Sequence, residues 1–173
     1  MLGYRYQGFE YNIYGYRGIY WTTPVSGEGK HLEYKITYRI PYIGLSSDLL
    51  FGKNKQFQLH LTFAYSDWAK ADDRDRHLYP DWDAAHPGYN LDRISEGDCE
   101  GEAYIMKIEG CWSFRPNWSL DLGGEYVAID TEGSQQQKEY INGILVGINT
   151  IPIKETITSS RWSAILRISY YGF

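Results

Sequence analysis

The most constraining feature of the sequence is a strict alternation of apolar and polar side chains. From Leu32 to Ile40 every second residue is large and apolar, and the residues between them are charged or threonine. With a few exceptions, the same period of two recurs at 57–66, 104–114, 118–126 and 161–170. Because successive side chains of a strand point to opposite faces, these segments predict antiparallel β-strands whose two faces meet different surroundings.

Composition narrows the choice of surroundings. The 173 residues include 17 Tyr, 6 Trp and 6 Phe, yet the mean hydropathy is -0.49. No stretch approaches the roughly 20 apolar residues that a membrane helix needs. Aromatic strands that are polar on average fit a transmembrane β-barrel, in which one face meets lipid and the other a polar interior. A soluble antiparallel sandwich is the alternative interpretation.

Charge and cysteine usage exclude two further possibilities. The net charge of -5, without a cluster of Lys and Arg, gives no reason to expect a nucleic-acid partner. Cys99 and Cys111 lie in one predicted extended run, so they would be separated by roughly 40 Å. Because a disulfide cannot span that distance, we interpret both as unpaired packing residues.

The predicted connections alternate in length. Short ones at 46–56 and 115–117 alternate with long polar ones at 21–30, 67–101 and 129–160, the last with a hairpin of its own around 140–153. Short turns at one end and long loops at the other are typical of an outer-membrane barrel. A further strand is expected within 2–20. We therefore predict an all-β, antiparallel, up-and-down transmembrane β-barrel fold with about six strands in this chain.

Two sets of residues follow from this interpretation. Aromatic residues at the strand ends are expected to form interfacial girdles, and charged residues are expected to pair inside the barrel. The girdle set is Tyr42, Trp68, Trp112, Trp118 and Trp162. The interior set is Arg5, Lys35, Arg39 and Arg167 with Glu33, Glu109, Asp121 and Glu125, and His60 is also expected to face the interior.

One constellation could carry chemistry. In Asp73-Arg74-Asp75-Arg76-His77, a strand would place Asp73, Asp75 and His77 on one face. A carboxylate beside an imidazole orients the ring and stabilises its protonated form, as a general base acting on water requires. Counted from Tyr65, however, this face is the lipid side, so an interior dyad requires a β-bulge, which we expect within 68–71. A solvated charged loop is the alternative.

The order of these motifs resembles the omptin family of outer-membrane proteases. The resemblance rests on Tyr38-Arg39-Ile40-Pro41-Tyr42-Ile43-Gly44-Leu45, on 57–65, on Ser66-Asp67-Trp68 and on Asp73-x-Asp75-x-His77, and it extends over nearly the whole chain. The stretch 97–101 is more similar to the chlamydial-type outer-membrane proteins of the same superfamily. The resemblance implies a ten-stranded barrel, of which residues 1–173 would form a single partial domain that contains the C-terminal strands and lacks the N-terminal ones.

The resemblance also implies roles for residues. Asp75 and His77 match the catalytic dyad of omptins, and Asp73 matches a carboxylate that helps to receive a basic residue of the substrate. The second aspartate pair of the family lies in N-terminal strands that have no counterpart here. Six strands would also leave two open edges, which hydrocarbon does not tolerate. We therefore expect no proteolysis by this chain alone.

Three functions follow from this reasoning. The first is a structural or adhesive outer-membrane β-barrel protein without activity in this chain. The second is an omptin-type Asp/His endopeptidase that cleaves near basic residues, provided that the full-length protein supplies the second aspartate pair. The third is a soluble ligand-binding β-domain.

The first two functions share their location and partners. We expect a Gram-negative bacterial outer membrane, with outer-membrane lipid as a partner, and lipopolysaccharide and basic peptides as further ones. No cofactor is expected, although lipopolysaccharide would be an activator if the protein resembles omptins in this respect. A metal is not expected, because the acidic and imidazole groups of Asp81, Asp83 and His86 match no known ligand loop.

Overall fold

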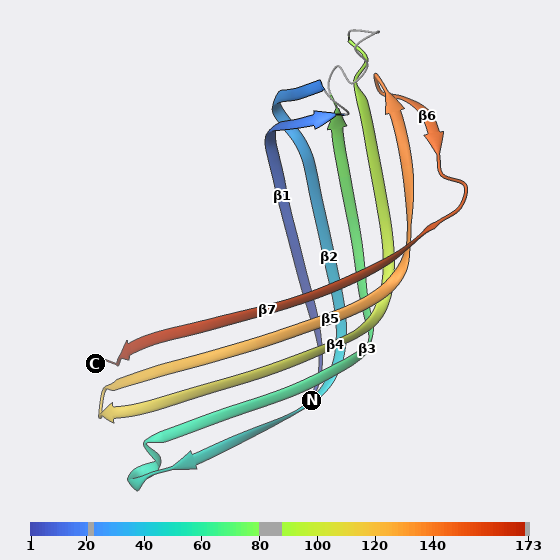
Figure 1. Ribbon diagram of the computed structural model, residues 1–173. Helices are drawn as coiled ribbons and strands as arrows, with labels where there is room; N and C mark the ends of the chain where they lie inside the picture. The colour runs from blue at the N-terminus through green and yellow to red at the C-terminus, as the bar shows by residue number, and fades with distance from the viewer. Residues whose placement is uncertain (21–22, 80–87, 172–173) are drawn as a thin grey trace.

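The computed structural model describes residues 1–20, 23–79 and 88–171. Within these ranges it describes all side chains except those of residues 16–27. The described residues form one sheet in which β1 to β5 follow in chain order, and both β6 and β7 pair with β5 (Figure 1). Every pairing is antiparallel, as the sequence predicts. The elements are β1 (Leu2–Tyr20), β2 (Thr23–Phe51), the 3-10 helix η1 (Lys53–Lys55), β3 (Phe57–Tyr79), β4 (Leu91–Arg115), β5 (Trp118–Ile141), β6 (Ile144–Ile148) and β7 (Ile153–Tyr170). No helix in these ranges is long and apolar enough to cross a membrane.

The strands are much longer than the alternating segments, so the prediction of long polar loops is wrong. Residues 67–79 continue β3, 91–101 begin β4, and most of 129–160 belongs to β5 and β7. Their polar side chains are held in ion pairs between neighbouring strands, such as Lys70–Glu100 and the 2.7 Å Lys138–Glu96 pair. Polar composition therefore marked surface strands rather than loops.

The turns agree better with the sequence. Pro116 and Asn117 form the tight turn between β4 and β5. The predicted hairpin after Tyr140 is also present, where Asn142 (φ 50°) and Gly143 (φ 81°) join β5 to β6. Two successive residues with positive φ favour Asn-Gly and match the twist of the flanking strands.

Each long strand has two halves that differ in what their faces carry. We call the half next to the turns at 52–56 and 116–117 the turn half, and the opposite one the loop half. The inner face is the one that carries the buried residues. These are chiefly Ile36, Tyr38, Ile40, Ala64, Ala69, Ala71, Cys99, Ala103, Ile105, Val127 and Ile129.

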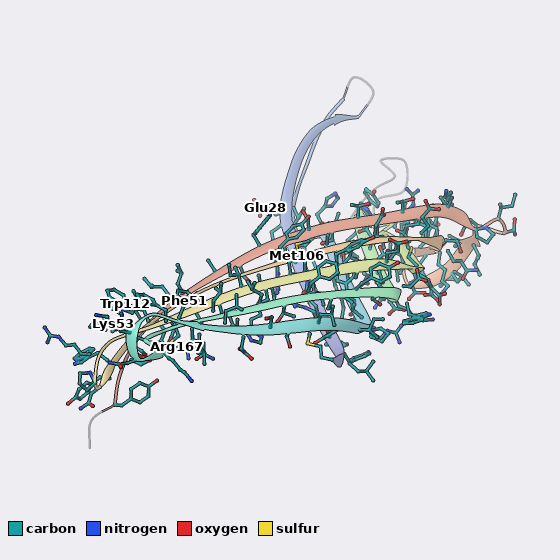
Figure 2. The ribbon with its side chains drawn as sticks, turned by 90° about the horizontal axis from the view of Figure 1, so that it is seen from below. Glu28, Phe51, Lys53, Met106, Trp112 and Arg167 are labelled. Atoms are coloured by element: carbon teal, nitrogen blue, oxygen red, sulfur yellow. The ribbon has the colours of Figure 1, made fainter. Side chains whose placement is uncertain are left out.

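The outer face of the turn half is an apolar belt. Large side chains are exposed there without a covering layer, among them Leu45, Phe63, Met106, Ile108, Leu122, Trp162, Leu166 and Ile168. At the end of the belt a row of aromatic rings crosses the strands with centroids 4.9–6.4 Å apart: Phe51, Phe57, Trp112, Phe114, Trp118 and Tyr170. In Figure 2, Phe51 and Trp112 lie together at this end. A continuous apolar face edged by aromatic rings is the lipid-facing pattern of a barrel wall.

The inner face of the turn half is charged, as predicted for part of the interior set. Arg5 of β1 bonds Glu125 of β5 at 2.8 Å, and Arg161 of β7 lies 3.4 Å from the same carboxylate. The pairing register also places Glu109, Asp121 and Arg167 on this face. His60 faces inward too, where its Nδ1 lies 2.7 Å from Asp48.

In the loop half the apolar side chains face inward and the charged ones face outward, which is the reverse of the turn half. Several predictions are wrong for this reason. Tyr34, Ile36, Tyr38 and Ile40 point inward, so Glu33, Lys35 and Arg39 lie on the outer face and not in the interior. Arg39 pairs there with Asp72. Tyr42 packs against the buried cluster and does not belong to a girdle. The predicted girdle residues Trp68, Trp112, Trp118 and Trp162 are exposed.

The exchange in β3 is caused by a β-bulge. Ser66 pairs with Ala103 and Ala69 pairs with Gly101, so Asp67 and Trp68 together face the single residue Glu102. One extra residue shifts the side-chain phase, because the period of a strand is two. Phe57 to Tyr65 therefore send their odd-numbered side chains outward, whereas beyond the bulge the odd-numbered ones point inward.

The sheet does not close on itself. β1 forms one edge and β6 and β7 form the other, and no pairing joins the two edges within the described ranges. The strands curve together, and the β1–β2 hairpin projects away from the other strands (Figures 1 and 2). The architecture is thus an open, curved barrel wall.

Candidate functional site

The predicted site residues lie together on the inner face of β3, just beyond the bulge. Asp73 pairs with Ile36 of β2 and Gly97 of β4, and Asp75 pairs with Tyr34 and Ser95. Because their neighbours Ile36 and Ser95 are buried on the inner face, Asp73, Asp75 and His77 face the interior. The bulge overlaps the segment in which the sequence required one.

Asp75 and His77 form a hydrogen-bonded pair. The distance between His77 Nε2 and Asp75 Oδ2 is 2.8 Å, and both side chains are about one-third exposed (31% and 30%). An ionised carboxylate only accepts, so Nε2 donates and the lone pair of the neutral ring is on Nδ1. A proton taken up by Nδ1 would produce an imidazolium that Asp75 stabilises. The pair can therefore act as a general base toward water.

Aromatic rings extend this pair. The ring of Tyr79 is stacked on that of His77, with 5.9 Å between centroids and 8° between planes. His31 of β2 meets Tyr79 edge-on at 5.3 Å. Sequence reasoning assigned no role to His31 or Tyr79, although the position of Tyr79 two residues after His77 on the same face could have suggested it.

Asp73 has a partner that sequence reasoning missed. Glu155 of β7 reaches across the inner face, and a Cβ atom at Gly97 would overlap both Glu155 Oε2 and Asp73 Oδ1. Within the described ranges Asp73 Oδ1 is buried and no group donates to it. Burial, followed by the charge of the neighbouring Glu155, raises the pKa of Asp73 to about 6. No local signal identifies Glu155, because it lies on a different strand.

The thiol of Cys99 completes this acidic cluster. Cys99 is fully buried, and its Sγ donates to Glu155 Oε2 at 3.6 Å. Burial and then the charge of Glu155 raise the pKa of Cys99 to about 12. Because a thiolate is the reactive form, this cysteine is a packing residue and not a nucleophile.

The described residues contain no group of three His, Cys, Asp or Glu side chains placed to hold a metal ion. Asp81, Asp83 and His86, the metal candidates considered from the sequence, lie outside the described residues.

Comparisons with known proteins agree with this geometry. The model of the Omptin family matches residues 1–142. The chain belongs to the omptin family. None of the curated proteins compared with it is similar enough in sequence to count as a match.

A solved structure supports the omptin fold over the rest of the chain. The crystal structure of the outer membrane protease OmpT from Escherichia coli is similar with a TM-score of 0.65 and 19% sequence identity. The match covers 98% of this chain and 55% of OmpT, so the chain spans about half the length of that protein. The predicted fold is thus confirmed: the curved antiparallel sheet is similar to part of the OmpT barrel.

Proposed function

We propose that this chain is a wall of an outer-membrane omptin barrel and that Asp75 and His77 are half of the active site of an Asp/His endopeptidase. The apolar belt supports the membrane location, because a soluble β-domain would not expose so many large side chains on one face. Outer-membrane lipid would contact the belt, and lipopolysaccharide would be a further partner.

The observation that carries the enzymatic part is the bulge between Ser66 and Ala69. It places the 2.8 Å Asp75–His77 pair in the interior, where a substrate could reach it, rather than on the lipid side. Family resemblance assigns the activation of water to such a pair, together with a second pair of aspartates. The proposal is that strands outside these 173 residues supply the second pair, and that the 173 residues alone do not cleave.

Asp73 supports a preference for basic substrates. Its carboxyl group lies two residues from Asp75 on the same face and has no cationic partner among the described residues. A Lys or Arg side chain of a peptide would supply the missing positive charge beside the dyad.

The test is peptide cleavage by the full-length protein in detergent with lipopolysaccharide, using a peptide with paired basic residues. His77→Ala and Asp75→Asn should each lower kcat/KM by about 10²–10⁴-fold. Asp72→Asn is the matched control, because Asp72 lies on the same strand but on the outer face, and it should leave kcat/KM unchanged.

Two results would contradict this proposal. Cleavage that survives His77→Ala would reject the dyad. A folded, full-length protein that cleaves no basic peptide would favour the structural or adhesive barrel instead.

A further inference from the structure

The acidic cluster beside the dyad contains a residue without an assigned role, Glu155. Glu155 pairs with Gly133 of β5, and Gly133 pairs with Cys99 of β4. Asp73 of β3 lies two residues further along the sheet, where it pairs with Gly97 of β4. Gly97 has no side chain, and this leaves the space in which the Glu155 and Asp73 carboxyl groups meet. Two residues 82 positions apart in the sequence thus face each other on the inner face.

We propose that Glu155 is a positioning residue for Asp73: the two carboxyl groups share one proton across Gly97, and this proton decides when the Asp73 subsite presents its full charge to a cationic side chain. The inference rests on the proposed function, because it concerns the same subsite.

Contacts on the inner face support a shared proton. Two ionised carboxylates repel each other and cannot bond, whereas one proton between them gives a short, charge-assisted hydrogen bond. The groups that face the pair add no positive charge: they are Tyr34 and Tyr38 of β2, Asp75 of β3, Cys99 of β4 and Gln135 of β5. The thiol of Cys99 donates to the same Glu155 oxygen that lies over Gly97, which fixes this oxygen in place.

The consequence is a subsite with two charge states. With the proton the pair carries one negative charge, and without it the pair carries two. A basic side chain binds the second state more tightly, so binding of the peptide releases the proton and becomes stronger as the pH rises. Glu155 acts through Asp73 in both states.

The first experiment measures KM and kcat of the full-length protein for a basic peptide between pH 5 and 7. In the wild type KM should fall roughly tenfold as the pH rises through the pKa of the pair. In Asp73→Asn this slope should disappear, and in Glu155→Gln it should move to lower pH, because burial alone then raises the pKa of Asp73. The matched control is Glu132→Gln on the outer face of β5, which should keep the wild-type slope. A wild-type slope in Glu155→Gln would overturn the proposal.

The second experiment does not depend on cleavage. The infrared C=O band of a protonated carboxyl group should persist to about pH 6 in the wild type, disappear in Asp73→Asn and be lost at a lower pH in Glu155→Gln. These two changes together support the pair even if the protein cleaves no peptide. A band that is absent from the wild type, or that keeps its wild-type pH range in Glu155→Gln, overturns it.

Discussion

The two halves of the strands use the same residue types with opposite orientation. In the turn half, apolar side chains such as Phe63 and Ile108 face outward and the Arg5–Glu125 pair lies inside. In the loop half, Ile36 and Tyr38 are buried inside, and ion pairs such as Lys138–Glu96 lie outside. The turn half is built like a barrel wall in lipid, and the loop half like a soluble sheet that stands in water.

The difference shows how one chain turns Asp75 and His77 toward its interior. In β2 the change comes from the sequence, because the adjacent residues Tyr42 and Ile43 are both apolar. The apolar side chains therefore stand at even-numbered positions up to Tyr42 and at odd-numbered positions from Ile43. β3 changes through its backbone, because the bulge at Asp67 and Trp68 shifts the phase. Only the second route turns Asp75 and His77 toward the interior.

Removing the bulge should have the largest effect. Deletion of Trp68 would restore continuous pairing, so either the odd-numbered side chains from Asp73 to His77 turn outward or the strand slips by one residue. We expect complete loss of cleavage and of the heat-resistant folded band on gels. Trp68→Ala keeps the extra residue and is the control; it should retain the folded band. A deletion variant that still cleaves would mean that the bulge does not set the orientation of Asp75 and His77.

The next largest effect should come from a charge on the outer face, and its cost in stability should differ between the two halves. Leu122→Arg places a cation in the belt and should lower the free energy of unfolding by about 2–4 kcal/mol, measured by denaturant titration in lipid vesicles. The equivalent change Thr158→Arg, at an exposed position of the loop half, should cost less than about 0.5 kcal/mol. Equal costs at the two positions would mean that the belt does not face lipid.

Ion pairs should also differ between the inner and outer faces. Arg5→Met leaves Glu125 with a weaker partner at 3.4 Å, Arg161, and should lower the free energy of unfolding by about 1–3 kcal/mol. Lys154→Met removes the outer pair with Glu132, whose side chains are 74% and 65% exposed, and should change it by about 0–1 kcal/mol. Denaturant titration of both variants measures the contrast, and a larger loss for Lys154→Met would reverse it.

The smallest effect concerns pH. Burial and Glu155 raise the pKa of Asp73 to about 6, above its ordinary value of 3.8, so the folded state binds the proton more tightly than the unfolded state. The resulting stabilisation is complete below pH 4 and is lost as the pH rises to 6, by about 1 kcal/mol after allowance for partial exposure. Asp73→Asn should flatten this part of the curve in thermal unfolding. A variant with the wild-type slope would place the titrating group elsewhere.

The fold could be predicted largely from the sequence because alternation is a local property. The segments 57–66, 104–114 and 161–170 are parts of real strands, and the turn at 115–117 was correct. In β3, β4, β5 and β7 most of the loop half was not recognised as strand, because its charged residues are stabilised by partners on neighbouring strands that no local window contains. For the same reason Lys35 and Arg39 were placed on the wrong face.

The candidate site, too, could be predicted from the sequence only in part. Asp73, Asp75 and His77 share one short motif, so their common face followed from spacing, and their orientation required only the bulge. Glu155 could not be found, because it joins Asp73 through the pairing of β7 with β5. A residue whose only signal is register across several strands becomes visible only in three dimensions.

The Asn142–Gly143 turn has a practical consequence. Both residues are exposed, no described atom beyond the chain neighbours lies within 4 Å of a Cβ built at Gly143, and the turn joins β5 to β6 at the end of the sheet opposite the belt. Exposed loop tips of this kind tolerate insertions. A short epitope inserted between these two residues should therefore be tolerated and be accessible to antibodies, so the turn offers a labelling position.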